Sequence, residues 1–208
     1  MQSQVRLPHF IVAKSVTMSY LILGLVLFLG GHSVRIFANP WRDAQLARLG
    51  ESRWKGMYSL LSALGLGLII WGYGLARVDP VVLWVPPPWT RHLAALLTLP
   101  VFVLLVAAYL PGSHIKAKIG HPMVAGVKLW ALAHLLANGN LADVILFGAF
   151  LAWAVADFIS ARRRDRITGR IYPVCCWTRD ASVTAIGLLA WALFALYGHV
   201  WLIGVRPF

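Results

Sequence analysis

The clearest polar side chains within the long apolar runs of this chain are His32, Lys128, His134 and His199. Polar groups inside an apolar segment are costly to bury, so each is a candidate functional residue. Zinc motifs are absent, since the sequence holds no HExxH and no CxxC, and the adjacent Cys175 and Cys176 have the wrong spacing for a zinc chelate. Neutral imidazole among apolar and aromatic side chains suits haem iron better than hard cations, which prefer oxygen ligands.

The surroundings of His134 favour a flat cofactor. On a helix this residue has Trp130 at i−4, Ala131 at i−3 and Ala137 at i+3. Two alanines beside an aromatic ring leave lateral room for a macrocycle, which makes Trp130 a candidate cofactor contact. Lys128 either binds a haem propionate or extends its ammonium to the headgroups, and the length of a lysine stem favours the second.

The surroundings of His32 allow a close approach. His32 follows Gly30 and Gly31, and glycines let a neighbouring helix or a ligand come near the backbone. An interhelical hydrogen bond is the alternative role for either histidine. Spacing does not decide between the two roles.

The composition shows which elements must position these residues. Of 208 residues, 60% are hydrophobic and 12% charged, against a usual charged share of about a quarter. So much apolar surface predicts an integral membrane protein of the all-α class, because helices satisfy their backbone within lipid. Apolar runs of about 20 residues predict a polytopic bundle of about six transmembrane helices, over 18–37, 57–75, 89–110, 121–138, 141–160 and 183–205. Residues 18–208 are then one bundle and residues 1–17 an N-terminal extension, with Met18 an alternative natural start.

The positive charges predict the orientation. The formal net charge is +12, which on a soluble protein would suggest nucleic acid as a partner. Here the basic residues lie between apolar runs, so we expect the lipid bilayer as their partner and no nucleic acid. Twelve of them fall in three breaks and five on the other side, leaving out Arg35 and Lys128. The three breaks, 39–56, 111–120 and 161–182, are therefore predicted to be cytoplasmic. The first is expected to form an amphipathic surface helix, with an ordinary basic loop as the alternative.

Depth in the membrane leaves the pairing of histidines open. The predicted spans place His32 toward the cytoplasmic side and His134 toward the opposite side, about 10 Å apart along the membrane normal at about 1.5 Å per residue. Helix tilt absorbs part of that offset. By depth alone, the alternative partners are His114 or His121 for His32, and His92 or His199 for His134.

Several sequence blocks resemble the NnrU family, bacterial inner-membrane proteins associated with nitrite and nitric oxide metabolism. The blocks are GGHSVR (30–35), LGESRWKGMYSLLSALGL (49–66), LWVPPPWTRH (83–92) and the long run 107–157 that contains HPMVAGVKLWALAH. The resemblance is strongest over residues 18–164. It implies a multi-pass protein of the bacterial inner membrane, auxiliary to denitrification, with nitric oxide as an expected ligand.

The same pattern is similar to zeta-carotene isomerase, a membrane enzyme with haem b. The shared features are an early HS, a GE-x-R turn, and His-Pro-x-x-x-G followed by W-x-L-A-H. The proposed axial ligands of that enzyme fall on His32 and His134, so the resemblance implies haem b at these positions. It also implies an alternative function, the redox-gated cis–trans isomerisation of a carotenoid or other isoprenoid. Ala131 stands where the isomerase has a cysteine, and Gly120 where arginine commonly precedes His-Pro.

Overall fold

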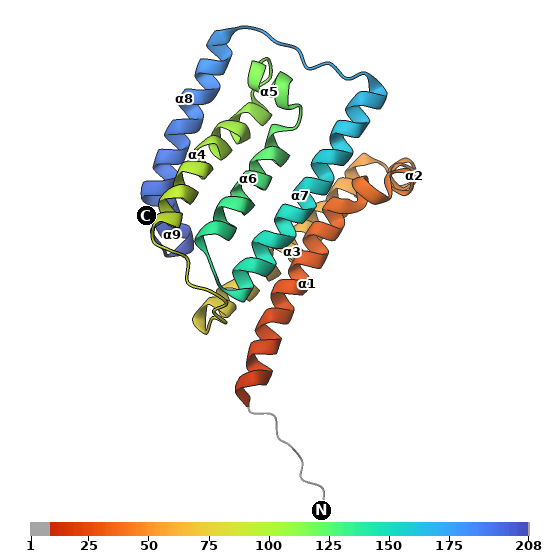
Figure 1. The fold of residues 1–208 in the computed structure, drawn as a ribbon. Helices are drawn as coiled ribbons and strands as arrows, with labels where there is room; N and C mark the ends of the chain where they lie inside the picture. The colour runs from red at the N-terminus through yellow and green to blue at the C-terminus, as the bar shows by residue number, and fades with distance from the viewer. Residues whose placement is uncertain (1–8, 208) are drawn as a thin grey trace, which may run out of the picture. The chain divides into compact units, whose positions relative to one another are not determined.

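The computed structural model describes residues 9–207, with side chains described from residue 18. Within that range every regular element is a helix, so the predicted all-α class is confirmed (Figure 1). Of the predicted extension, residues 1–8 lie outside the described residues and residues 9–17 belong to the first helix. The elements are α1 His9–Phe37, α2 Asn39–Leu49, α3 Glu51–Val78, α4 Trp89–Tyr109, α5 His114–Ile119, α6 Pro122–Ala137, α7 Leu141–Thr168, α8 Trp177–Leu193, the π-helical η1 Phe194–Gly198 and α9 His199–Ile203.

Five helical stretches are long and apolar enough to cross a membrane. They are Met18–Phe37, Glu51–Val78, Trp89–Tyr109, Leu141–Thr168 and Trp177–Ile203. The predicted span over 121–138 is an apolar helix too, but α6 has only 16 residues. Its start is set by Gly120, whose φ of 78° lies outside the helical region, and its end by Asn138, which is extended.

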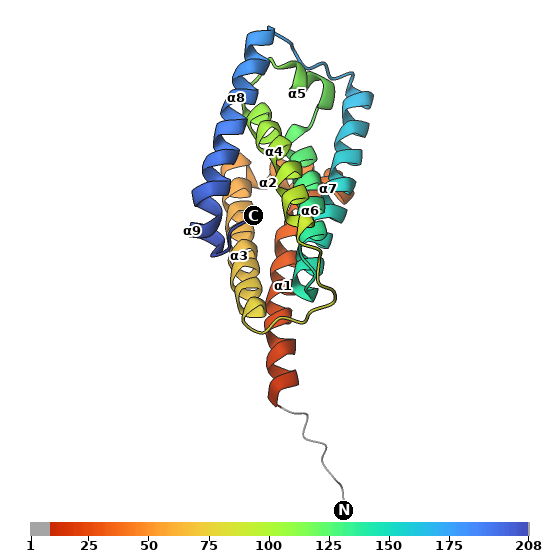
Figure 2. The ribbon, with the colours of Figure 1, turned by 60° about the vertical axis from the view of Figure 1, so that its left-hand side comes forward.

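The chain divides into two compact units. The first holds α1, α2, α3 and the start of α7 through Leu146; the second holds α4, α5, α6, the rest of α7, α8, η1 and α9. In the first unit α1 and α3 run side by side in opposite directions, joined through α2 (Figures 1 and 2). In the second unit α4 packs between α6 and α8.

Helices α1 and α3 meet backbone against backbone. A Cβ atom added to Gly65 would lie 2.7 Å from the backbone nitrogen of Phe28, and one added to Gly72 would strike the backbone of Leu21. Leu21 is fully buried in this contact. Gly67, two residues after Gly65, faces open space. Small residues allow such an approach where lipid supplies no hydrophobic force between helices.

The basic breaks are largely helical. The helix predicted within 39–56 is present as α2, where the exposed Trp41 packs edge-on against Trp54 of α3 at 5.9 Å. The break 111–120 contains α5, whose first turn is capped because the Ser113 side chain accepts a hydrogen bond from the backbone of Lys116. The break 161–182 consists of the end of α7, an irregular segment over 169–176, and the start of α8.

Candidate functional site

In the first unit, His32 is oriented by its own helix. Its Nδ1 lies 2.7 Å from the backbone oxygen of Phe28, and since a carbonyl only accepts, Nδ1 carries the proton. In the neutral ring the lone pair is then on Nε2, the tautomer that binds iron through Nε2. The ring stacks on Phe28 at 4.2 Å and tilts against Tyr58 of α3 at 5.2 Å.

In the second unit, His134 repeats this arrangement. Its Nδ1 donates to the backbone oxygen of Trp130 at 2.8 Å, which again leaves the lone pair of the neutral ring on Nε2. The ring lies 5.2 Å from the Trp130 ring and 4.7 Å from the Phe147 ring of α7. Trp130 in turn contacts Phe147 and Phe150 edge-on. His134 therefore belongs to an aromatic cluster shared by α6 and α7.

The space expected beside the two histidines is only partly open. Ala131 is fully buried, so the room predicted on that side of His134 is filled by protein, whereas Ala137 is half-buried. Beside His32, a Cβ on Gly30 would meet nothing within 4 Å, and one on Gly31 would lie 3.3 Å from the Leu61 side chain. Close backbone contact between α1 and α3 occurs at Gly24, Gly65 and Gly72, and not at Gly30 or Gly31, where the sequence permits the approach of a helix or a ligand.

Lys128 has a specific partner. Its Nζ lies 3.8 Å from the centroid of the Phe158 ring on α7. An ammonium group over an aromatic face is attracted by the ring quadrupole. The half-buried Lys128 thus adds a second contact between α6 and α7, and its predicted role toward a propionate or the headgroups stays a prediction.

His114 and His121, the candidate partners of His32 by depth, bond to carboxylates. Nδ1 of His114 lies 2.6 Å from Oδ2 of Asp180, and Nε2 of His121 lies 2.9 Å from Oδ2 of Asp165. His121 thus bonds its carboxylate through Nε2, the nitrogen that carries the lone pair in the neutral ring of His32.

His92 and His199, the candidate partners of His134 by depth, each lie in the first turn of a helix. His92 is exposed near the start of α4. The half-buried His199 begins α9, and its Nδ1 lies 2.6 Å from the backbone oxygen of Val205. The donor chemistry of His32 and His134 fits haem ligation, and the pairing of ligands stays a prediction.

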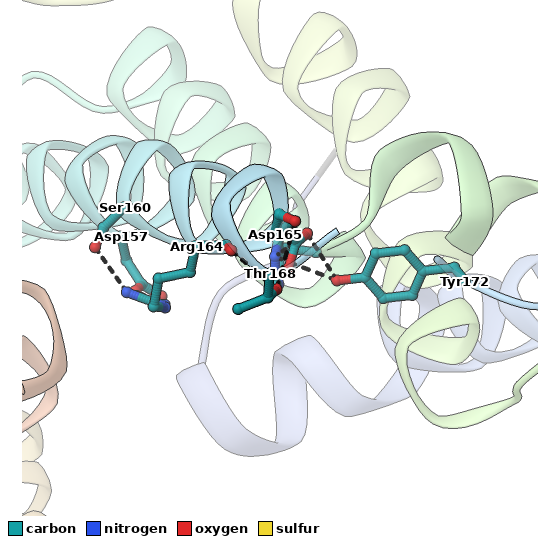
Figure 3. A network of polar contacts seen from close by, with 7 residues as sticks. Asp157, Ser160, Arg164, Asp165, Thr168 and Tyr172 are labelled. Carbon is teal, nitrogen blue, oxygen red and sulfur yellow. Dashed lines mark hydrogen bonds and ion pairs between the residues drawn. The ribbon is translucent and has the colours of Figure 1, made fainter. Parts of the chain in front are cut away.

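Asp165 is the centre of a polar network that the sequence did not reveal (Figure 3). The carboxylate is buried, and its Oδ2 accepts hydrogen bonds from Tyr172 Oη and His121 Nε2, each at 2.9 Å. Burial and then the bond to Asp165 raise the pKa of Tyr172. The network ties the end of α7 to the start of α6 and to the segment after α7. A single acid inside the run RRRDR was the signal that could have found it.

A second polar contact lies earlier on α7. Asp157 pairs with Arg164 at 3.8 Å, and Arg164 also donates a hydrogen bond to the Ser160 hydroxyl at 2.7 Å (Figure 3). The side chain of Arg162 turns toward Gly120.

Asp143 caps the start of α7. It accepts hydrogen bonds from the backbone nitrogen of Asn140 at 3.2 Å and from its side chain at 2.9 Å. Its other oxygen accepts a hydrogen bond from the Tyr73 hydroxyl at 2.6 Å, a contact that joins α3 to the start of α7 within the first unit.

Among the described residues, no group of three or more His, Cys, Asp or Glu side chains is placed to hold a metal ion. A haem iron takes at most two protein ligands, so such a cluster is not needed for the predicted cofactor.

The profile of the NnrU protein family matches residues 20–207. The chain belongs to the NnrU family. The match confirms the resemblance and extends it past residue 164, to cover α8, η1 and α9 as well. Searches of curated proteins and of solved structures gave no match. At the level of the family, membership supports a denitrification-associated protein, and the five apolar helices fit a multi-pass protein of a lipid bilayer.

Proposed function

We propose that this NnrU-family protein binds haem b, with His32 and His134 as axial ligands, and serves denitrification or nitric oxide metabolism as an auxiliary protein of the bacterial inner membrane. The observation that carries the proposal is the geometry common to the two histidines. Each donates from Nδ1 to the carbonyl one turn back, at 2.7 and 2.8 Å, and each contacts an aromatic ring of a neighbouring helix. In His121, by contrast, Nε2 itself bonds the Asp165 carboxylate.

This geometry gives the chain's residues definite tasks. The carbonyl oxygens of Phe28 and Trp130 hold the Nδ1 protons, which fixes the tautomer, limits ring rotation and raises the basicity of Nε2. The rings of Tyr58 and Phe147 restrict each imidazole from the side of a second helix and help to exclude water. A bound haem would supply one-electron chemistry and an iron that binds small gases such as nitric oxide.

A second candidate is a haem-dependent cis–trans isomerase acting on a carotenoid or other isoprenoid. The observation that favours it is an open groove of about 460 Å³ in the second unit, lined entirely by apolar surface. Phe102 and Tyr109 of α4 and Ile186 and Ala190 of α8 form part of its wall. An apolar chain matches such a lining, although neither His32 nor His134 belongs to it.

The visible absorption spectrum of the detergent-purified protein tests haem binding. We expect a Soret band and, after dithionite reduction, the sharp bands of a six-coordinate b haem. His32→Ala and His134→Ala should each lose stoichiometric haem while the protein still inserts into the membrane. His199→Ala is the matched control, because that ring also contacts a backbone carbonyl through Nδ1, and it should keep full haem.

Two results would contradict the ligand assignment. A preparation that stays colourless after haem is added back would show that the protein does not bind haem. A full complement of haem in His134→Ala would show that His134 is not a ligand of the iron, and it would favour the pairing of His32 with His121. Nitric oxide that changes the spectrum supports the gas-linked role, whereas conversion of a polyene isomer by the purified protein, followed by chromatography, would favour the isomerase.

A further inference from the structure

The two cysteines of the chain are adjacent and lie together on the segment 169–176, between α7 and α8. Cys175 is exposed, Cys176 is half-buried, and their Sγ atoms are 3.1 Å apart. Adjacent cysteines cannot complete a zinc site. Two convergent, accessible thiols are suited to a different chemistry, which needs only the two sulfur atoms and an external oxidant.

The segment that carries the pair is anchored on both sides. Before it, Tyr172 donates to Asp165 at 2.9 Å (Figure 3). At the pair itself, the backbone nitrogen of Cys175 donates to the oxygen of Gly112 at 2.9 Å.

After the pair, Trp177 stacks on His114 with ring centroids 4.2 Å apart, and Asp180 holds His114 at 2.6 Å. These contacts, all within the second unit, fix the backbone that presents the two thiols.

The two thiols differ in acidity. Hydrogen bonds from the Thr178 hydroxyl, the Cys175 thiol and the backbone of Arg179 lower the pKa of Cys176 to about 7. The hydrogen bond with Cys176 and the charge of its thiolate raise the pKa of Cys175. The geometry agrees with this direction, because Cys176 stands at the N-cap of α8 with its Sγ 3.0 Å from the Thr178 hydroxyl oxygen. Cys176 is therefore assigned as the nucleophile and Cys175 as the thiol that reacts second.

We propose that Cys175 and Cys176 form a thiol–disulfide exchange site for a low-molecular-weight disulfide. The thiolate of Cys176 attacks one sulfur of the disulfide, the sulfur–sulfur bond breaks, and one thiolate leaves. Cys175 then gives its proton to solvent and attacks Sγ of Cys176, and the second thiolate leaves. The chain loses two electrons and two protons, and the external disulfide becomes two thiols.

The product is expected to be easily reduced. Consecutive Cα atoms are about 3.8 Å apart across a trans peptide, below the roughly 4.4–6.8 Å that disulfides prefer, so a bond between adjacent cysteines is strained. Strained and exposed disulfides are the labile ones. The pair is thus suited to cycle between its two states under a thiol buffer and is not suited to brace the fold.

The test exposes the reduced, detergent-purified full chain to glutathione buffers of increasing oxidised fraction, without oxygen. After acid quenching and alkylation, intact mass spectrometry counts free thiols. We expect both thiols to become unavailable together, with the loss of two hydrogen atoms and no attached glutathione. A stable glutathione adduct on the wild-type chain, or two thiols that remain alkylatable, would overturn the proposal.

Three variants sharpen the test, because no other cysteine is present in the chain. Cys175→Ser should stop at a mixed disulfide on Cys176. Cys176→Ser should react with the oxidant about fivefold to tenfold more slowly at pH 7, because its remaining thiol is little ionised. Thr178→Val should slow the first step while leaving the final product unchanged. Equal rates in all four proteins would show that the two thiols have no division of roles.

Discussion

Two pairs of helices in this protein pack closely in different ways. In the first unit, α1 meets α3 through glycines, and the backbone of Phe28 lies against Gly65. In the second unit, α6 meets α7 through side chains, with Trp130 edge-on to Phe147 and the Lys128 ammonium over the Phe158 ring.

One predicted haem ligand belongs to each contact. The contact of α1 with α3 should tolerate no added volume, whereas the contact of α6 with α7 should suffer when volume is removed. The two histidines share one local geometry. Their surroundings differ, so we expect different kinds of substitution to disturb the orientation of each ring.

The largest effect is expected at the glycine contact. Gly65→Leu would drive a side chain into the backbone of Phe28, which cannot move aside as a side chain can. We expect a loss of more than about 3 kcal/mol in the free energy of unfolding, because the clash with the backbone can be relieved only by moving the two helices apart. Thermal unfolding in detergent measures it. Gly67→Leu, on the same helix but facing open space, should change the midpoint little; equal losses would show that the contact is not decisive.

An intermediate effect is expected at the aromatic contact. Phe147 is buried and touches both Trp130 and His134, so Phe147→Ala should cost about 3 kcal/mol through lost packing. The same thermal measurement applies, with the exposed Ile159 of α7 changed to alanine as the control. If Phe147→Ala were as mild as Ile159→Ala, the cluster would not hold α6 to α7.

The smallest effect is expected where the start of α6 meets the end of α7. Asp165→Asn removes the charge that accepts from His121 and Tyr172, and should cost at most about 1 kcal/mol, since the amide keeps one acceptor.

The pH dependence of Tyr172 gives the sharper readout. Its pKa is raised in the fold, so the contribution of its neutral phenol is present below the ordinary phenol value of about 10 and is lost as the pH rises through the raised value. In Asp165→Asn that loss should begin at lower pH. An ultraviolet pH titration, compared with Tyr172→Phe, measures it, and an unchanged titration would show that Asp165 does not act on Tyr172.

Much of the fold was predictable because lipid permits few kinds of spanning structure. Apolar runs predicted each of the long helices that could cross a membrane. Helix ends were less predictable, since hydropathy marks the edge of the membrane and not the end of a helix. Helix α7 continues through its arginines until Gly169, where φ is 61°.

The contacts between helices could not be predicted from one sequence. Gly30 and Gly65 look alike in the sequence, yet only the second lies against a neighbouring backbone, because helix rotation decides which face meets a partner. His121 lies 44 residues before Asp165, so their contact exists only once the start of α6 lies beside the end of α7. The orientation of His32 and His134, by contrast, follows a local rule of i and i−4 on one helix.

The length of α6 has a consequence for the surrounding lipid. Its 16 residues span about 24 Å at about 1.5 Å per residue, short of a hydrocarbon layer of about 30 Å. Where α6 crosses the membrane as the sequence predicts, the bilayer must thin around it, or headgroups and water must descend toward its ends. The adjoining α5, with Lys116 and Lys118, places positive charge where anionic headgroups would reach down. Hydrophobic mismatch at this one helix would make the protein prefer short-chain, anionic lipids as its immediate neighbours.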